Sequence, residues 1–375
     1  MKILIAGDFC PQNRVANLIE VKKYSKVFSD VLTYTSRADL SIVNLEAPMV
    51  EHEAKGIEKC GPCLRGTSKS VDAIKYAGFN VVTLANNHFY DYGEVGVADT
   101  LKACRERGIV TIGGGKNLCE ASQVAYFDIC GKTLAIINCC ENEFSIATET
   151  TSGANPLNPI QQYYKIKEAR KNADYVLIIV HGGHEHYQLP SPRMKETYRF
   201  FIDAGADAVV NHHQHCYSGY EVYNGKPIFY GIGNFLFDWE GERNSIWNEG
   251  YMVELSFDDN ISFKLIPYVQ CSEKPTIELM AEGKLREFES QIDRLNEIIR
   301  DDEKLKISFI NLVKQKCSGQ KVIFTPYTNR YLRALAFRGW IPSFLNNKKL
   351  TELINYIGCE SHRDISLPLL QRLIK

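Results

Sequence analysis

Short polar motifs recur along the first 240 residues, and each follows directly after an apolar run. They contain acids, histidines and asparagines, side chains that bind divalent metal ions and transfer protons in enzymes. In chain order the motifs are Gly7-Asp8, Asn44-Leu45-Glu46, Asn86-Asn87-His88, His181-Gly182-Gly183-His184-Glu185 and His213-Gln214-His215. This recurrence is typical of a metalloenzyme whose site is assembled from several elements of the fold.

The apolar runs before these motifs are expected to be strands buried on both faces, because they are rich in valine and isoleucine. They cover residues 3–6, 40–43, 81–85, 176–180 and 208–210. Polar residues at the carboxyl ends of strands in an open α/β sheet face one shared cleft. The sequence therefore predicts a metal centre at one sheet edge.

Histidines give the strongest metal-ligand pattern. In His213-Gln214-His215 the two imidazoles lie at i and i+2, which share one face of an extended segment. His212 makes three histidines in four residues, which argues against a chance pair. His181 ends one of the most apolar runs, and Gly182-Gly183 allow close approach of the backbone. We predict that His181, His213 and His215 are metal ligands.

Carboxylates and an amide complete the predicted ligand set. Asp8 and Glu46 supply carboxylates, and the side-chain carbonyl of Asn87 is a neutral hard ligand. His88, beside Asn87, is a proton donor suited to neutral pH. Other interpretations remain open: Asp8 could cap a helix, Glu46 could be a surface acid, and Asn87-His88 could belong to a hydrogen-bond network within a loop.

Overall composition excludes several classes of protein. The 375 residues carry 44 Lys and Arg against 45 Asp and Glu, a net charge of −1 that argues against a nucleic-acid-binding surface. No apolar run approaches the roughly 18–20 residues that cross a bilayer, so we expect no transmembrane segment. We also expect no leader, since Met1-Lys2 passes straight into a strand, and 12 cysteines then indicate reduced thiols. The expected location is the cytoplasm.

Helical segments alternate with the strands in the first part of the chain. Residues 71–78, 97–108 and 194–205 are expected helices, and each range ends on a glycine. Two later hairpins are expected, over 219–230 around Asn224-Gly225 and over 252–266. This order predicts a layered α/β domain with a mixed sheet or two stacked sheets.

After Gln270 the pattern becomes helical. Leu285, Phe288, Ile292, Leu295 and Ile299 recur at three- and four-residue spacing, an apolar stripe on a charged helix. We expect a catalytic domain over residues 1–271 and a helical C-terminal appendage over 272–375. A homo-oligomer formed through these helices is possible.

Six motifs in order resemble the CapA family, the bacterial capsule and poly-γ-glutamate assembly group of the calcineurin-like metallophosphatase superfamily. The resemblance covers about residues 1 to 240. It rests on Gly7-Asp8, Asn44-Leu45-Glu46-Ala47-Pro48, Ala85-Asn86-Asn87-His88 with Asp91 and Gly93, His181-x-Gly183-x-Glu185, Gly205-Ala206-Asp207 followed by His213-x-His215, and Gly233-Asn234-Phe235 with Asp238.

The resemblance implies a four-layer αββα sandwich with a two-metal centre. Asp8 would bridge the metals, Glu46 and His215 would serve one ion, and Asn87, His181 and His213 the other. His88 would be the general acid, with Asp91 and Glu185 as further catalytic residues. Substrate contacts would come from Asn44, Asn86, His184 and Asn234. Cys10 stands where the superfamily's first motif has a histidine, and the Asn44/Glu46 pair replaces an aspartate of its second motif.

The leading expected function is metal-dependent hydrolysis of a phosphoester, linked to capsule or exopolymer metabolism, with two divalent ions of Mn, Fe, Zn or Mg. The substrate would be a small or polymeric anion. The alternative is a capsule or poly-γ-glutamate assembly protein that binds or processes an anionic polymer without phosphatase activity. A third possibility, a non-catalytic metal-dependent binding module, is disfavoured by Asn87-His88, because a binder needs no proton donor.

Overall fold

The computed structural model describes residues 1–28, 30–258, 260–321 and 324–373. It divides into two compact units, Met1–Lys306 and Ile307–Lys375, which are described separately. The strands belong to the first unit.

In the described part of the chain, the first sheet has eight strands, in the order β16-β15-β14-β1-β2-β3-β4 with β13 also paired to β1. Strands β1 to β4 and β13 run parallel, and β14 and β15 are antiparallel neighbours. The bounds are β1 Lys2–Cys10, β2 Leu40–Leu45, β3 Val81–Thr83, β4 Val110–Ile112, β13 Asn234–Phe237, β14 Glu249–Ser256, β15 Ser262–Gln270 and β16 Ile277–Leu279.

The second sheet has six strands among the described residues, in the order β11-β12-β10-β9-β7-β6. Its four central strands are parallel, and its two edge strands are antiparallel. The bounds are β6 Ala125–Ile129, β7 Lys132–Cys140, β9 Tyr175–His181, β10 Ala208–His212, β11 Tyr220–Tyr223 and β12 Lys226–Phe229. A small ladder joins β5 Gly114–Gly115 to β8 Gly153–Ala154.

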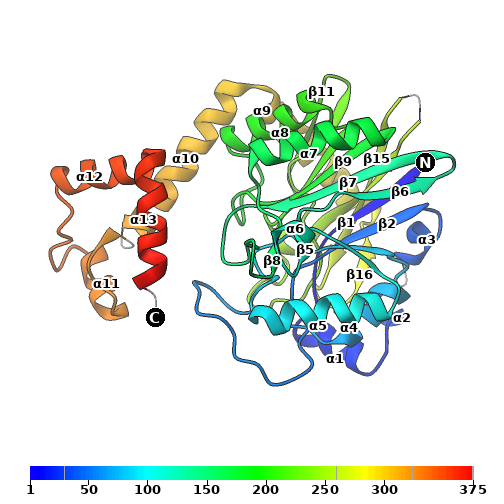
Figure 1. Cartoon of the computed structure of the whole chain (residues 1–375), viewed down its shortest axis with the longest axis horizontal. Coiled ribbons are helices and arrows are strands. Elements are labelled where there is room, and N and C mark those ends of the chain that lie inside the picture. The colour runs from blue at the N-terminus through cyan, green and yellow to red at the C-terminus, as the bar shows by residue number, and fades with distance from the viewer. Residues whose placement is uncertain (29, 259, 322–323, 374–375) are drawn as a thin grey trace. The chain divides into compact units, whose positions relative to one another are not determined.

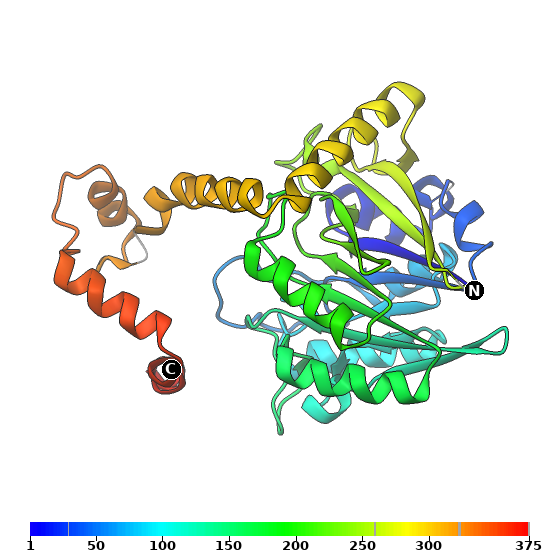
Figure 2. The ribbon, with the colours of Figure 1, turned by 90° about the horizontal axis from the view of Figure 1, so that it is seen from above.

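Alternation of buried side chains along β1 shows how the layers stack. Ile3 and Ile5 pack into one core with second-sheet residues such as Ile178, whereas Leu4 packs into another core with the helix residue Val71. Figures 1 and 2 show helices on the two outer sides of the paired sheets. Helices α1, α4 and α5 cover the first sheet, and α7 and α8 cover the second. The expected four-layer αββα sandwich is confirmed.

The helix bounds are α1 Asn13–Glu20, α2 Ser25–Phe28, α3 Leu32–Thr35, α4 Ser68–Tyr76, α5 Gly93–Glu106, α6 Leu118–Ala121, α7 Pro159–Asn172, α8 Pro192–Ala204, η1 Ile246–Asn248, α9 Glu282–Arg300 and α10 Asp302–Lys321. The three expected helices correspond to α4, α5 and α8. Both expected hairpins are present as β11–β12 and β14–β15. Asn224 and Gly225 have positive φ angles of 50° and 76°, as the tight turn between β11 and β12 requires.

The apolar stripe of α9 packs into the core of the first unit. Phe288, Ile292, Leu295 and Ile299 are buried, and the ring of Phe288 lies 5.0 Å from that of Tyr217. Contacts therefore divide the chain between 306 and 307, whereas the sequence suggested a division after 271. The difference arises because a charged helix that follows the last strand still buries one face on the sandwich.

The second unit contains helices α11 Arg330–Phe337, α12 Asn347–Gly358 and α13 Glu360–Leu373. Many of its large apolar side chains are exposed, including Trp340, Ile354 and Ile365. Within the described ranges, none of the helices is both long and apolar enough to cross a bilayer.

Candidate metal centre

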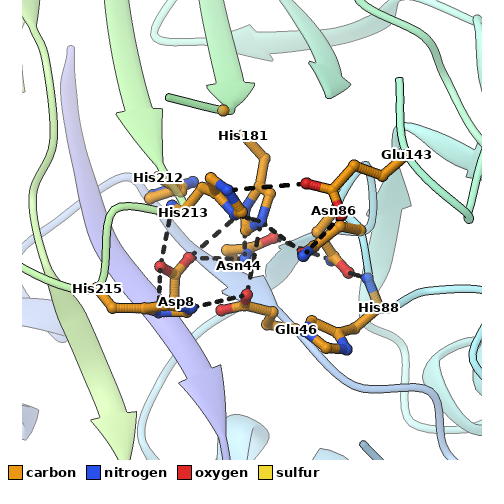
Figure 3. A network of polar contacts seen from close by, with 12 residues as sticks. Asp8, Asn44, Glu46, Asn86, His88, Glu143, His181, His212, His213 and His215 are labelled. Atoms are coloured by element: carbon orange, nitrogen blue, oxygen red, sulfur yellow. Dashed lines mark hydrogen bonds and ion pairs between the residues drawn. The ribbon is translucent and has the colours of Figure 1, made fainter. Parts of the chain in front are cut away.

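The ends of five strands place the predicted ligands around one point between the two sheets (Figure 3). From the first sheet, Asp8 lies within β1, Glu46 follows β2 and Asn87 follows β3. From the second sheet, His181 ends β9, while His213 and His215 follow β10. All six side chains are buried.

His213 and His215 reach the centre by a different backbone path from the extended one expected. Their φ angles are 92° and 55°, in the left-handed region that non-glycine residues rarely adopt. Both lie outside the strands, in the irregular segment after β10, and their ring centroids are 6.0 Å apart. Left-handed non-glycine conformations cost about 1–3 kcal/mol each and cluster at functional sites.

One possible ligand group consists of Glu46, His181 and His213. Nε2 of His181 lies 3.5 Å from Oε1 of Glu46 and 3.1 Å from Nδ1 of His213. Oδ1 of Asn87 is 3.0 Å from the same His181 nitrogen. Asn87 is therefore close enough to add an oxygen ligand to this group.

A second possible group consists of Asp8, Glu46 and His215. Nδ1 of His215 is 3.7 Å from Oδ2 of Asp8, and Nε2 of the same ring is 3.6 Å from Oε1 of Glu46. Glu46 thus belongs to both groups. The family resemblance had implied that Asp8 would be the residue shared between the two metals. Asp8 already accepts hydrogen bonds from Nδ2 of Asn44 at 2.8 Å and from the backbone N–H of His213 at 3.1 Å.

The donor set fits divalent cations. Both carboxylate oxygens of Glu46 are buried without a hydrogen-bond partner among the described residues, a costly arrangement that a cation would relieve. Burial, followed by the charge of Asp8, raises the pKa of Glu46 well above its usual range. Burial lowers the pKa of His213 to about 4 and that of His215 to about 3, so both imidazoles are neutral at pH 7. Neutral imidazole is the form that binds metal.

His88 lies beside this set in a hydrogen-bonded cluster with Asp91 and Lys59. Nδ1 of His88 is 2.7 Å from Oδ2 of Asp91, which also accepts from the backbone N–H of Leu64 at 2.7 Å. Nζ of Lys59 lies 2.5 Å from Oδ1 of Asp91 and 3.2 Å from Nδ1 of His88. With its Nδ1–H donated to Asp91, His88 has a fixed ring orientation, and Nε2 is the nitrogen left for other chemistry.

Three residues expected to contact substrate lie beside the possible ligands and are hydrogen-bonded to neighbouring side chains. Nδ2 of Asn44 donates a hydrogen bond to Asp8, and Oδ1 of Asn44 accepts one from Nδ2 of Asn86 at 3.3 Å. Oδ1 of Asn234 is 2.9 Å from Nδ1 of His215. All three asparagines are fully buried, which favours a role in orienting neighbouring side chains, and their contact with substrate stays a prediction.

The remaining predicted residues lie in the loop after β9. Glu185 is exposed and lines a cavity together with His88, whereas His184 is half-buried and is not among the residues lining that cavity. Cys10, at the position of the superfamily histidine, is buried and belongs to neither possible ligand group. Burial raises the pKa of its thiol well above the usual range.

Two residues at the site escaped the sequence reasoning. Lys59 comes from a loop without any periodic pattern, and nothing in the sequence connects it to His88. Glu143 lies 3.9 Å from Nε2 of His213 and accepts from Nδ2 of Asn87 at 3.5 Å. Glu143 did carry a signal, because it follows the apolar strand β7 in the same way as the other motifs follow theirs.

Two solved structures that align with this chain have low sequence identity. A hypothetical protein from Thermus thermophilus is 16% identical, with a TM-score of 0.46, covering 71% of this chain and 99% of its own. A novel phosphatase from Mycoplasma pneumoniae is 15% identical, with a TM-score of 0.46, covering 73% of this chain and 95% of its own.

Curated relatives are more similar in sequence. Capsule biosynthesis protein CapA of Bacillus anthracis is 32% identical over 255 residues, 65% of this chain and 62% of that protein. PGA biosynthesis protein CapA of Bacillus subtilis (strain 168) is 32% identical over 244 residues, 64% of each chain. The match therefore spans less than two thirds of the length of each relative.

The family model described as bacterial capsule synthesis protein PGA_cap matches residues 2–239. This segment is more than half of the chain and contains every residue of the two possible ligand groups. The expected membership of the CapA family is confirmed: the chain belongs to the bacterial capsule synthesis protein PGA_cap family.

Proposed function

We propose that this protein is a metal-dependent hydrolase that cleaves a phosphoester in capsule or exopolymer metabolism. The observation that carries the proposal is the position of Glu46, which belongs to both possible ligand groups and whose two oxygens are buried without a hydrogen-bond partner among the described residues. Asp8, Glu46 and His215 would hold one divalent ion, and Glu46, His181, His213 and Asn87 the other. Such ions polarise a phosphoryl group and make water a stronger nucleophile at neutral pH.

The chain itself supplies the proton for the leaving group. In hydrolysis, a water oxygen bonds to phosphorus, the bond from phosphorus to the leaving oxygen breaks, and that oxygen takes a proton. Asp91 holds Nδ1 of His88, so Nε2 is the edge that can give this proton. Lys59 balances the charge of Asp91 in the buried cluster. A side chain held by packing and by two neighbours is well oriented for general acid catalysis.

Family membership supports a second possibility, that the site acts on or binds a polyanion such as polyglutamate without phosphatase activity. The His88–Asp91 pair favours catalysis over this alternative, since binding alone requires no oriented proton donor.

Purified full-length protein, analysed for bound metal and reloaded with Mn²⁺, Zn²⁺, Fe²⁺ or Mg²⁺, should hydrolyse an aryl phosphate monoester or diester. Glu46→Gln should abolish this activity, whereas Glu53→Gln, an exposed control, should not. Full metal loading without turnover of any phosphoester, together with specific polyglutamate binding, would support the alternative.

A further inference from the structure

A cavity of about 200 Å³ opens beside the metal centre. Its wall includes His88, the proposed proton donor, and His215, a proposed ligand. The ring of Trp247, also in the wall, lies 4.6 Å from the ring of His215. A group that leaves from the centre towards His88 would therefore enter this cavity. Its volume is below the roughly 300–1,000 Å³ of pockets for drug-sized ligands, so it suits a small group.

Three aromatic rings form much of the cavity wall. Phe237 lies 4.9 Å from Trp247 and 5.8 Å from Trp239, both at steep interplanar angles. The indole N–H of Trp247 donates to the backbone carbonyl of Phe237 at 2.9 Å, which satisfies the polar edge of that ring. The three rings are tilted against one another, so they can enclose a small group from several sides. Tryptophan faces attract cations more strongly than those of other aromatic residues.

Apart from His88, which carries the proton that it would give, the charged residues of the cavity wall are acids. Glu185 and Glu242 both line it, and Oε2 of Glu242 accepts a hydrogen bond from Ser245 at 3.0 Å, which fixes that carboxylate. In the described part of the chain, the wall contains no lysine or arginine. Lys59, which contacts the wall residue His88, is paired with Asp91. The wall also includes His186, whose ring is stacked on Trp247 at 5.6 Å.

These features favour a cation and oppose an anion. Aromatic faces and carboxylates both stabilise an ammonium group, and aromatic cages are a general solution for binding quaternary ammonium ligands. A carboxylate, such as a polyglutamate side chain, would meet two like charges in this wall. An uncharged alkyl group would gain apolar contact but nothing from the two acids.

We propose that this cavity binds a small ammonium-bearing alcohol as the leaving group of the phosphoester. This inference rests on the proposed hydrolase function for its position in the reaction. The binding property itself depends only on the cavity.

The test uses two alcohols of the same shape, choline and 3,3-dimethyl-1-butanol, of which only choline is charged. Two of the three tryptophans of the chain line the cavity, and the third, Trp340, is exposed in the second unit. Full-length Trp340→Phe protein therefore reports cavity binding by tryptophan fluorescence. We expect choline to bind about tenfold more tightly than its neutral analogue.

Glu242→Gln should weaken choline binding several-fold and leave the neutral alcohol unaffected. Glu240→Gln, an exposed acid in the same loop, is the matched control. Equal affinity for both alcohols, no binding of either, or preferential binding of acetate would overturn the proposal. Turnover of an aryl phosphate is measured separately. Choline selectivity without turnover would contradict only the hydrolase function, and turnover without selectivity would contradict only the cavity assignment.

Discussion

Nε2 of His181 lies 3.5 Å from Oε1 of Glu46, although the two residues come from different sheets. Glu46 follows β2 of the first sheet, and His181 ends β9 of the second. The candidate centre therefore joins the two halves of the sandwich. An ion held by this pair would link the sheets as well as serve the reaction, so metal binding and folding stability should be coupled.

Glu46→Gln should remove more metal than substitution of a ligand belonging to one group. The shared position of Glu46 predicts loss of both ions, whereas His213→Ala or Asp8→Ala should lose one ion while the protein stays folded. Elemental analysis of purified variants, with circular dichroism to verify folding, measures the outcome. Two ions retained in Glu46→Gln would contradict the shared role, and undiminished metal in both His213→Ala and Asp8→Ala would contradict the whole ligand set.

Removal of metal should lower the melting temperature. A ligand at about 100 times its Kd stabilises the folded state by about 2.7 kcal/mol, which corresponds to a shift of several degrees for a domain of this size. We expect a chelator to lower the Tm of the purified protein by roughly 5–10 °C. The chelator should change the Tm of the Glu46→Gln variant only slightly. A chelator effect of equal size in this variant would mean that the stabilising ion lies elsewhere.

His88→Ala should keep its metal and lose turnover by roughly 10²–10⁴-fold, the usual contribution of a general acid. The loss should shrink as the leaving group becomes more acidic, because a good leaving group needs no proton. Rates for a series of aryl phosphates with different phenol pKa values provide the measurement. A loss that is uniform across the series would assign His88 another role.

We expect Lys59 to position His88 through Asp91, so Lys59→Met should lower kcat by roughly tenfold with little change in KM. The substitution leaves the buried Asp91 carboxylate without its cation, so the partner of His88 is less well held. Lys59→Arg should restore part of the rate, and Lys55→Met, an exposed lysine in the same loop, should have no effect. A change confined to KM, or no rescue by arginine, would argue against positioning.

The sequence was sufficient to predict the strands and the buried acids, histidines and asparagine that gather at their ends. Runs such as Val176–Val180 are apolar on both faces, and a polar residue directly after such a strand is held at the sheet edge. The sequence could not show which carboxylate is shared. Which carboxylate is shared depends on the distance between the two sheets, and this distance cannot be predicted from the periodic pattern of the sequence.

Residues on irregular loops were the least predictable part of the site. Lys59 and Trp239 lie outside helices and strands, and only the folded chain brings Lys59 to His88 and Trp239 to Phe237. The sequence also could not predict the roles of the buried asparagines, because these roles depend on the folded structure. An amide beside a ligand can bind substrate or orient that ligand, and the choice depends on whether solvent reaches it. Asn234 is fully buried and its Oδ1 lies 2.9 Å from Nδ1 of His215, which favours the orienting role.

Chain truncation separates the contributions of the C-terminal helices. A chain ending at Lys306 keeps α9 and the bond from Lys195 to Asp302, so it should retain metal, fold and solubility. A chain ending at Gln270 loses four buried apolar side chains of α9, worth roughly 1.5–3 kcal/mol each, and should associate or aggregate through the surface around Tyr217. Size-exclusion chromatography and elemental analysis distinguish the two. Metal loss in the longer chain would mean that the second unit supports the centre, and a monomeric, equally stable shorter chain would mean that α9 contributes nothing to the core.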